Sequence, residues 1–171
     1  TLADGDLQFD EDQKLAGWTK TFDKPTHLDS YKKLLLLHAF NFSIPGIPVI
    51  YYGDEYGMPG ANDPDNRRQM QFKGLDENEM NEKREVSELI RLRKNNLALI
   101  YGTTEVVILE NGVLHIKRKY LDNEVDVFFN NSNEIKKVET DLTQVKEMFG
   151  EPPLGANGIE LAPNTYYFLV K

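Results

Sequence analysis

One continuous segment, residues 46–70, constrains the chain more than any other. Its sequence is GIPVIYYGDEYGMPGANDPDNRRQM. The apolar run 47–52 shows no alternation, and a continuous apolar run is typical of a buried parallel strand. Gly53 ends the run, and the residues that follow are rich in Asp, Glu, Asn and Arg. Polar groups just beyond the carboxyl end of such a strand mark the functional edge of an α/β barrel or open sheet. The segment therefore predicts a site that holds a polar ligand.

The composition limits the classes of partner. The 171 residues allow one domain or two small ones. Acidic residues exceed basic ones, 28 to 20, for a net charge of −8. We therefore expect no nucleic-acid partner and no anionic membrane surface, because both require basic patches. The absence of cysteine excludes disulfides and thiolate metal sites and leaves the compartment open. No apolar run is long enough to span a membrane.

Helices are predicted before residue 103. The apolar stretch 28–43 predicts a helix that Pro45 and Gly46 end. Asp76 and Glu79 form a D-x-x-E start typical of a capping box, and the helix that they open should run to about Asn95. A short helix is expected around Trp18 within the otherwise polar residues 1–27.

From Thr103 on, the hydrophobic period changes from helical to two, which predicts β-strands. Asn111-Gly112 is a strong hairpin signal, Asp122-Asn123 predicts a second turn, and residues 166–170 predict the final strand. Residues 140–158 show no regular pattern. Five or six short antiparallel strands with such turns favour a small sandwich or Greek key. The chain should therefore divide into residues 1–102 and an all-β domain, residues 103–171.

The run GIPVIYYGDEYGMPGANDPDNRRQM closely resembles the last barrel strand and following loop of the α-amylase family, glycoside hydrolase family 13. It is most similar to the neopullulanase, cyclomaltodextrinase and maltogenic-amylase group. The resemblance implies an α+β chain: the last strand and helices of a (β/α)8 TIM barrel, followed by a small antiparallel β-sandwich as the C-terminal domain. Members of the family are several times longer, and this chain does not begin with Met, so we expect a C-terminal fragment.

Asp54 and Glu55 are adjacent carboxylates, but we assign neither a catalytic role. Glycoside hydrolysis commonly uses two carboxylates across one bond, and neighbouring side chains on an extended chain point to opposite faces. The resemblance implies that the catalytic carboxylates follow the fourth, fifth and seventh barrel strands. The Asn-His-Asp motif of the seventh strand occurs nowhere in this sequence. We therefore expect no catalytic residue in the chain.

Asp63 and Arg67 are the candidate substrate-binding residues. A guanidinium offers five donors and a carboxylate offers acceptors, so the pair can hold vicinal sugar hydroxyls. The family resemblance places both at the glycone-side subsites, through the motif N-D-P-x-N-R. The alternative is an internal salt bridge that only shapes the loop. Asn66 and Arg68 are weaker candidates.

Other residues favour structural interpretations. Tyr51 and Tyr52 are expected in the barrel core rather than stacked on sugar, and Trp18 is expected to pack its helix rather than bind. The histidines have no metal-ligand spacing. Acidic residues near the start fit no EF-hand calcium loop, so we expect no metal in this chain, while calcium stays open for the full-length protein. The acidic residues in question are Asp4, Asp6, Asp10 and Asp12.

The resemblance implies that the full-length protein hydrolyses α-1,4 glucosidic bonds with retention, with α-1,6 bonds as a second candidate. Its substrate would be an α-glucan or maltooligosaccharide, and it would need no cofactor. This chain would contribute glycone-side contacts and structural support, would be inactive alone, and would self-associate through its exposed barrel part. Two alternatives stay open: a non-catalytic glycan-binding module and a purely structural subdomain.

Overall fold

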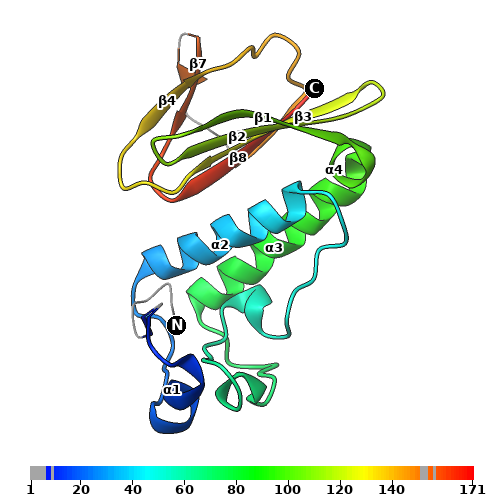
Figure 1. Ribbon diagram of the computed structural model, residues 1–171. Helices are drawn as coiled ribbons and strands as arrows, with labels where there is room; N and C mark the ends of the chain where they lie inside the picture. Colours follow the sequence, from blue (N-terminus) through cyan, green and yellow to red (C-terminus); the bar gives the residue numbers. More distant parts are fainter. Residues whose placement is uncertain (1–6, 9, 151–153, 156) are drawn as a thin grey trace. The chain divides into compact units, whose positions relative to one another are not determined.

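A computed structural model describes residues 7–8, 10–150, 154–155 and 157–171. The chain forms two compact units. The first unit comprises Thr1–Leu35 with Val49–Ser87, and the second comprises Leu36–Pro48 with Glu88–Lys171. Two long helices contribute to both units: α2 (Leu28–Ser43) and α3 (Glu77–Asn95), which Figure 1 draws in blue and green. The boundary after residue 102 stays a prediction. From Thr103 on, the described chain contains strands and no helix.

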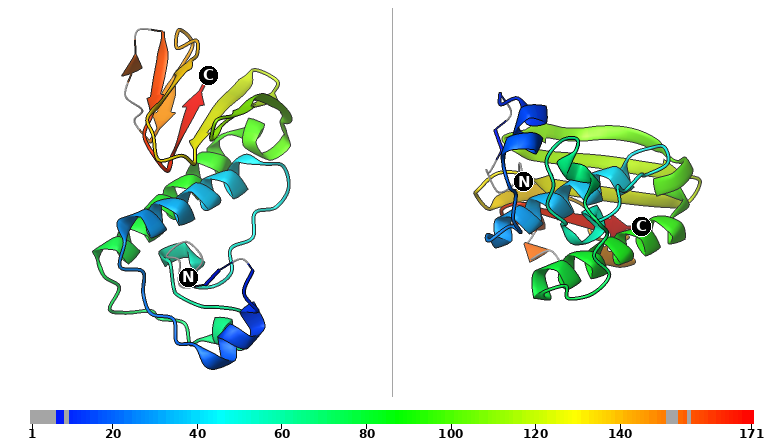
Figure 2. Two further views of the ribbon diagram at one scale, coloured as in Figure 1. Left: turned by 60° about the vertical axis from the view of Figure 1, so that its left-hand side comes forward. Right: turned by 90° about the horizontal axis from the view of Figure 1, so that it is seen from below.

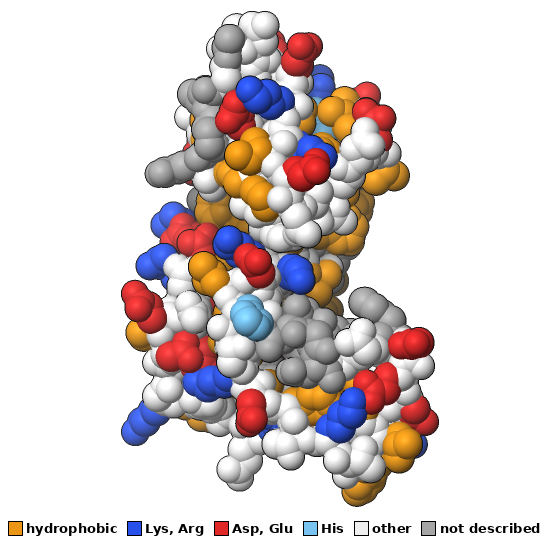
Figure 3. Space-filling model, turned by 90° about the vertical axis from the view of Figure 1, so that its left-hand side faces the viewer, with side chains coloured by type: hydrophobic (Ala, Val, Ile, Leu, Met, Phe, Trp, Pro, Cys, Tyr) orange, Lys and Arg blue, Asp and Glu red, His pale blue; other side chains and the backbone are white. Residues whose placement is uncertain are grey.

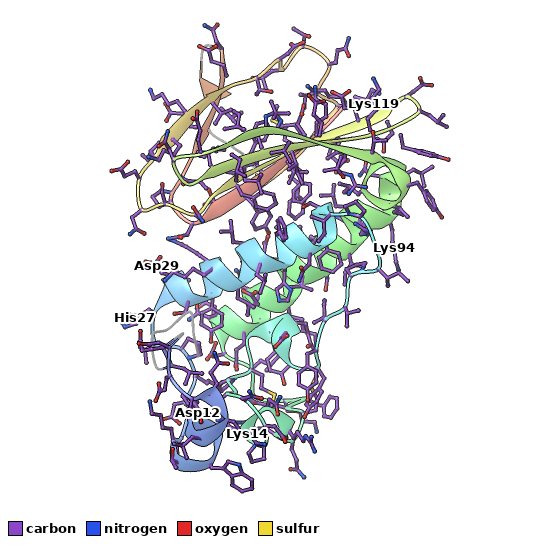
Figure 4. The ribbon with its side chains drawn as sticks, in the orientation of Figure 1. Asp12, Lys14, His27, Asp29, Lys94 and Lys119 are labelled. Carbon is purple, nitrogen blue, oxygen red and sulfur yellow. The ribbon has the colours of Figure 1, made fainter. Side chains whose placement is uncertain are left out.

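The first unit is built from helices and loops. Besides the first parts of α2 and α3, it contains α1 (Gln13–Thr19) and two short 3-10 helices, η1 (Asp54–Tyr56) and η2 (Asp65–Arg67). The side chain of Asp12 accepts hydrogen bonds from the backbone of Lys14 and Leu15, both at 3.0 Å, and so caps α1. Figure 4 shows Asp12 at the start of this helix.

The predicted capping box opens α3. The backbone N–H of Glu79 donates to Asp76 Oδ1 at 3.0 Å, and the backbone N–H of Asp76 donates to Glu79 Oε2 at 2.8 Å. Each side chain thus satisfies a donor of the other residue. Lys24 Nζ lies 2.6 Å from the same Glu79 oxygen, which pairs a carboxylate that is otherwise buried.

Two buried arginines complete the carboxyl end of α2 in the second unit. Arg93 donates to the carbonyls of Phe42, Ile44 and Gly46 at 2.7, 3.0 and 2.6 Å. Arg118 donates to the Ser43 carbonyl at 2.7 Å. The last carbonyls of a helix have no partner within it. These guanidiniums supply the missing donors, while burial lowers the pKa of both.

The second unit carries two antiparallel sheets, visible in Figures 1 and 2. The five-stranded sheet has the order β1-β2-β3-β8-β5, and the three-stranded sheet has the order β4-β7-β6. The short helix α4 (Leu97–Tyr101) leads into the first strand. The strands are β1 (Thr103–Glu110), β2 (Val113–Tyr120), β3 (Asn123–Asn130), β4 (Lys136–Glu139), β5 (Glu147–Phe149), β6 (Leu154–Gly155), β7 (Gly158–Leu161) and β8 (Thr165–Val170).

Both sheets contribute to one hydrophobic core. Phe128 on β3 and Leu169 on β8 come from the larger sheet, whereas Val138 on β4 and Leu161 on β7 come from the smaller one. All four are buried. β3 and β8 are buried along most of their length. Because successive side chains of a strand point to opposite faces, both faces of these two strands are covered.

The hairpin turns follow the sequence in part. Asn111 and Gly112 take positive φ values of 51° and 80°, as the predicted Asn-Gly turn requires. The next turn is shifted by one residue from the prediction. Leu121 and Asp122 form it, and Asn123 already begins β3. The segment predicted as irregular, residues 140–158, contains β5 and β6 and the first residue of β7.

The predicted strand at residues 47–52 does not form in this structure, and the prediction is wrong for the isolated chain. None of these residues belongs to a sheet or pairs as a strand with another described residue. Ile47 and Val49 are 91% and 80% exposed. A parallel strand needs neighbours on both edges and cover on both faces. No other parallel strand occurs among the described residues, so the apolar run stays unpaired.

Among the described residues, no helix combines the length and the apolar character needed to cross a membrane. On the face that Figure 3 shows, acidic and basic side chains are interspersed.

Candidate functional site

The loop that follows residues 47–52 begins with a tight turn. Gly53 and Gly57 have φ values of 94° and 77°, which side chains with a Cβ rarely adopt, and they flank η1. The backbone N–H of Gly53 donates to Glu55 Oε2 at 2.7 Å. Glu55 therefore stabilises the turn. Its neighbour Asp54 instead lines a surface depression, so the two adjacent carboxylates do not face one site.

Asp65 and Arg68 close the loop. The Asp65 carboxylate accepts two hydrogen bonds from Arg68 Nη2, both at 2.8 Å, and one from Arg68 Nε at 3.0 Å. Its Oδ2 atom also accepts from the backbone N–H of Ala61 at 2.8 Å. Arg68 Nη1 donates to the carbonyl of Phe22 at 2.7 Å, which connects the loop to the segment after α1. Arg68 is thus a structural residue.

Asp63 and Arg67 lie on the same loop and contact each other. Arg67 Nε is 2.8 Å from Asp63 Oδ1. That oxygen has no well-aligned hydrogen bond within the described residues, so the contact is an ion pair rather than a linear hydrogen bond. The side chains are 72% and 47% exposed. No other hydrogen bond or ion pair of either side chain occurs among the described residues.

Tyr51 and Tyr52 contact the backbone on both sides of Arg67. Tyr51 Oη donates to the carbonyl of Asn66 at 3.2 Å, and Tyr52 Oη donates to the carbonyl of Arg68 at 2.9 Å. The two rings lie 4.5 Å apart between centroids and are tilted by 41°. The neighbouring Tyr52 hydroxyl raises the pKa of the Tyr51 hydroxyl. Tyr51 and Tyr52 are 47% and 40% exposed, so the predicted core position is wrong for the isolated chain.

A depression of about 230 Å³ lies against this loop. It contains both tyrosine rings, a carboxylate and an amide, which are groups able to bind a polyhydroxylated ligand. Asn66 Oδ1 is an acceptor there without a partner among the described residues. The lining residues are Tyr51, Tyr52, Asp54, Met58, Asn66 and residues 59–61. Asp63 and Arg67 are not among the lining residues. Along the chain, Arg67 directly follows the lining residue Asn66, and Asp63 lies three residues before it.

Two further predictions concern residues near the start of the chain. Trp18 does not pack its helix, because its side chain is 70% exposed. Gly17, by contrast, lies so close to the loop that a Cβ there would be 2.6 Å from the Asn62 carbonyl oxygen.

Asp4 and Asp6 lie outside the described residues. Within the described part, no cluster of three His, Asp or Glu side chains is placed to hold a metal ion.

Sequence reasoning missed the groups that shape the loop. The i,i+3 spacing of Asp65 and Arg68 is the signal that could have revealed their pairing. No spacing in the sequence predicts that Tyr51 and Tyr52 lie side by side, because consecutive residues of a strand should point to opposite faces.

The sequence is similar to those of characterised proteins, although no protein-family model matches it. It is 34% identical to a cyclomaltodextrinase of Thermoanaerobacter pseudethanolicus over 147 residues, covering 80% of this chain and 24% of that protein. A cyclomaltodextrinase of Geobacillus thermopakistaniensis is 38% identical over 110 residues, covering 63% of this chain and 18% of that protein. The chain thus spans a quarter or less of the length of these two relatives.

Solved structures show the same similarity in fold. A crystal structure of an Anoxybacillus α-amylase superposes with a TM-score of 0.70 at 31% identity, over 82% of this chain and 32% of that one. A maltogenic amylase from S. marinus gives a TM-score of 0.63 at 29% identity, over 81% of this chain and 19% of that one. The chain is therefore a relative of the α-amylase-family glycosidases, to which the cyclomaltodextrinases and the maltogenic amylase above belong, and it matches only a part of their length.

Proposed function

We propose that the chain is the C-terminal part of an α-glucan-active glycoside hydrolase. Residues 47–52 would be the last strand of a (β/α)8 barrel, α2 and α3 would be helices of that barrel, and the two sheets would form the sandwich domain that follows. The full-length enzyme would hydrolyse α-1,4 glucosidic bonds with retention, and α-1,6 bonds are a second candidate. Retention requires a glycosyl-enzyme intermediate and one carboxyl group that acts first as acid and then as base.

The observation that carries this proposal is the arrangement of Asp63 and Arg67. Both side chains are exposed, they are paired at 2.8 Å, and they stand on a loop that Asp65 and Arg68 hold closed. An exposed ion pair contributes little to stability, so it has no evident structural task. Its remaining acceptor and donors suit the hydroxyls of a sugar. We infer that this pair binds the glycone side of a maltooligosaccharide.

The chain itself would be inactive. Asp54 and Glu55 face different surroundings, and the catalytic carboxylates are expected on earlier barrel strands. We expect the purified 171-residue chain to hydrolyse no starch, pullulan or cyclodextrin, and the full-length enzyme to hydrolyse at least one of them. Robust hydrolysis by the isolated chain would show that its own carboxylates are catalytic.

The alternative, a non-catalytic glycan-binding module, predicts exposed aromatic side chains across the sheets. Among the described residues from Thr103 on, the largely exposed apolar side chains are aliphatic, for example Val106 and Leu109. A glycan array probed with the 171-residue chain separates the two proposals. Strong binding that survives Asp63→Ala and Arg67→Ala would favour a binding module over an enzyme fragment.

A further inference from the structure

The backbone carbonyls of the residues before and after Arg67 accept hydrogen bonds from the hydroxyls of Tyr51 and Tyr52. Tyr51 Oη donates to the carbonyl of Asn66, the residue before it, at 3.2 Å. Tyr52 Oη donates to the carbonyl of Arg68, the residue after it, at 2.9 Å, and lies 3.5 Å from the Asn66 carbonyl. The tyrosine pair therefore anchors the peptide unit before Arg67 and the peptide unit after Arg68.

A local turn brings the tyrosines together. On a regular strand, consecutive side chains point to opposite faces. Here the backbone N–H of Asp54 donates to the Tyr51 carbonyl at 3.0 Å, so residues 51–54 form a turn and Tyr52 lies within it. Both rings can therefore lie on one side, 4.5 Å apart between centroids, and reach the same loop.

The tyrosines are not the only residues that hold the loop. The paired side chains of Asp65 and Arg68 connect it to Ala61 and Phe22. Among the described residues, the side chain of Arg67 makes one ion pair, with Asp63. An exposed arginine loses considerable side-chain entropy when it is held in one conformation. Fixing the backbone on both sides reduces the freedom that ligand binding must remove.

We propose that Tyr51 and Tyr52 are positioning residues that orient Arg67 toward the glycone end of the bound α-glucan. This role rests on the proposed function of Asp63 and Arg67. The hydroxyls, not the rings, perform it, and they act through the backbone rather than by contact with the sugar. The rings would still be free to line the depression.

The test is a double-mutant cycle in the full-length enzyme with maltoheptaose as substrate. Tyr51→Phe and Tyr52→Phe remove the hydroxyls and keep the rings. A neutral hydrogen bond contributes on the order of 0.5–1.5 kcal/mol, or roughly two- to tenfold. We expect each variant to raise KM by that factor and to leave kcat within about twofold, since binding is lost without loss of chemistry. Tyr101→Phe, an exposed tyrosine of the second unit, is the matched control and should change neither constant.

The decisive arm repeats both substitutions in the Arg67→Ala background. If the tyrosines act through Arg67, their removal there should change KM no further. An equal loss in both backgrounds would overturn the proposal, because the hydroxyls would then act independently of Arg67. A second outcome would also overturn the positioning proposal: Arg67→Ala raises KM, but both tyrosine variants keep the wild-type KM. The proposed function of Arg67 would then stand. Wild-type kinetics in Arg67→Ala itself would overturn both.

Discussion

Arg68 donates hydrogen bonds to the Asp65 carboxylate from two of its nitrogens, at 2.8 to 3.0 Å. Its neighbour Arg67 pairs with Asp63 through one nitrogen and stays exposed. The same residue type in adjacent positions thus has two different environments. The exposed fraction of the side chain, 27% for Arg68 and 72% for Arg67, separates a structural arginine from one available to a ligand.

Arg68→Ala should destabilise the first unit. It removes several hydrogen bonds to a charged group and leaves the Asp65 carboxylate without that partner, at a cost of about 2–3 kcal/mol. Arg67→Ala is the matched control, because an exposed pair contributes about 0–1 kcal/mol. Urea unfolding of both variants measures the difference. Equal stability of the two would contradict the structural assignment of Arg68.

Arg93→Ala should lower the free energy of unfolding by about 3 kcal/mol or more, because the buried guanidinium supplies donors to three carbonyls at the end of α2. Arg91→Ala, two residues earlier on α3, is the control. Its side chain is 70% exposed and pairs with Glu88. We expect a change of less than about 0.5 kcal/mol there. Comparable losses in both variants would show that Arg93 does not stabilise the helix end.

Glu82 should make stability depend on pH. It is fully buried, and neither carboxylate oxygen has a partner among the described residues. Burial, with a smaller contribution from Glu85, raises the pKa of Glu82 to about 8 from the ordinary 4.5. The folded state therefore keeps a proton that the unfolded state loses. Stability should be greatest below pH 4.5 and fall toward pH 8, at up to about 1.4 kcal/mol per pH unit.

Glu82→Gln should remove this component, so the variant should gain stability over the wild type as pH rises through that window. Glu105→Gln, at an exposed position of β1, is the control and should follow the wild type. Chemical denaturation at several pH values provides the measurement. A constant difference between wild type and Glu82→Gln across this range would show that Glu82 does not titrate with a raised pKa.

The isolated chain should self-associate through residues 47–52. Ile47 and Val49 are almost fully exposed on an unpaired segment, and such segments pair with other copies. Light scattering during size-exclusion chromatography should show oligomers that the double variant Ile47→Lys, Val49→Lys reduces. A monodisperse wild-type monomer would contradict this prediction.

The sequence predicted those elements whose signals are local. The apolar stretch 28–43 gave α2 with its observed bounds, the Asp76–Glu79 capping box opens α3, and Asn111-Gly112 forms the first hairpin turn. The strand at residues 47–52 failed because a parallel strand depends on neighbours that this chain does not supply. The sequence does not predict β5 and β7, because both strands are short and depend on pairing with distant partners.

The site was predictable only in part. Asp63 and Arg67 were singled out by their motif, and the structure brings them together. Their function as ligand-binding residues stays a prediction. The roles of Arg68, Tyr51 and Tyr52 depend on how the loop folds back on itself, which spacing along the chain does not reveal.

The most direct measurement of the central claim is steady-state kinetics of Asp63→Ala and Arg67→Ala in the full-length enzyme, on a long and a short maltooligosaccharide. A charged hydrogen bond to a hydroxyl contributes on the order of 1.5–3 kcal/mol, so kcat/KM on the long substrate should fall roughly ten- to a hundredfold. The short substrate should suffer less, because it does not fill the remote subsites, and the melting temperature should not change. Equal losses on both substrates with a lowered melting temperature would contradict the account and leave the pair as a loop-shaping salt bridge.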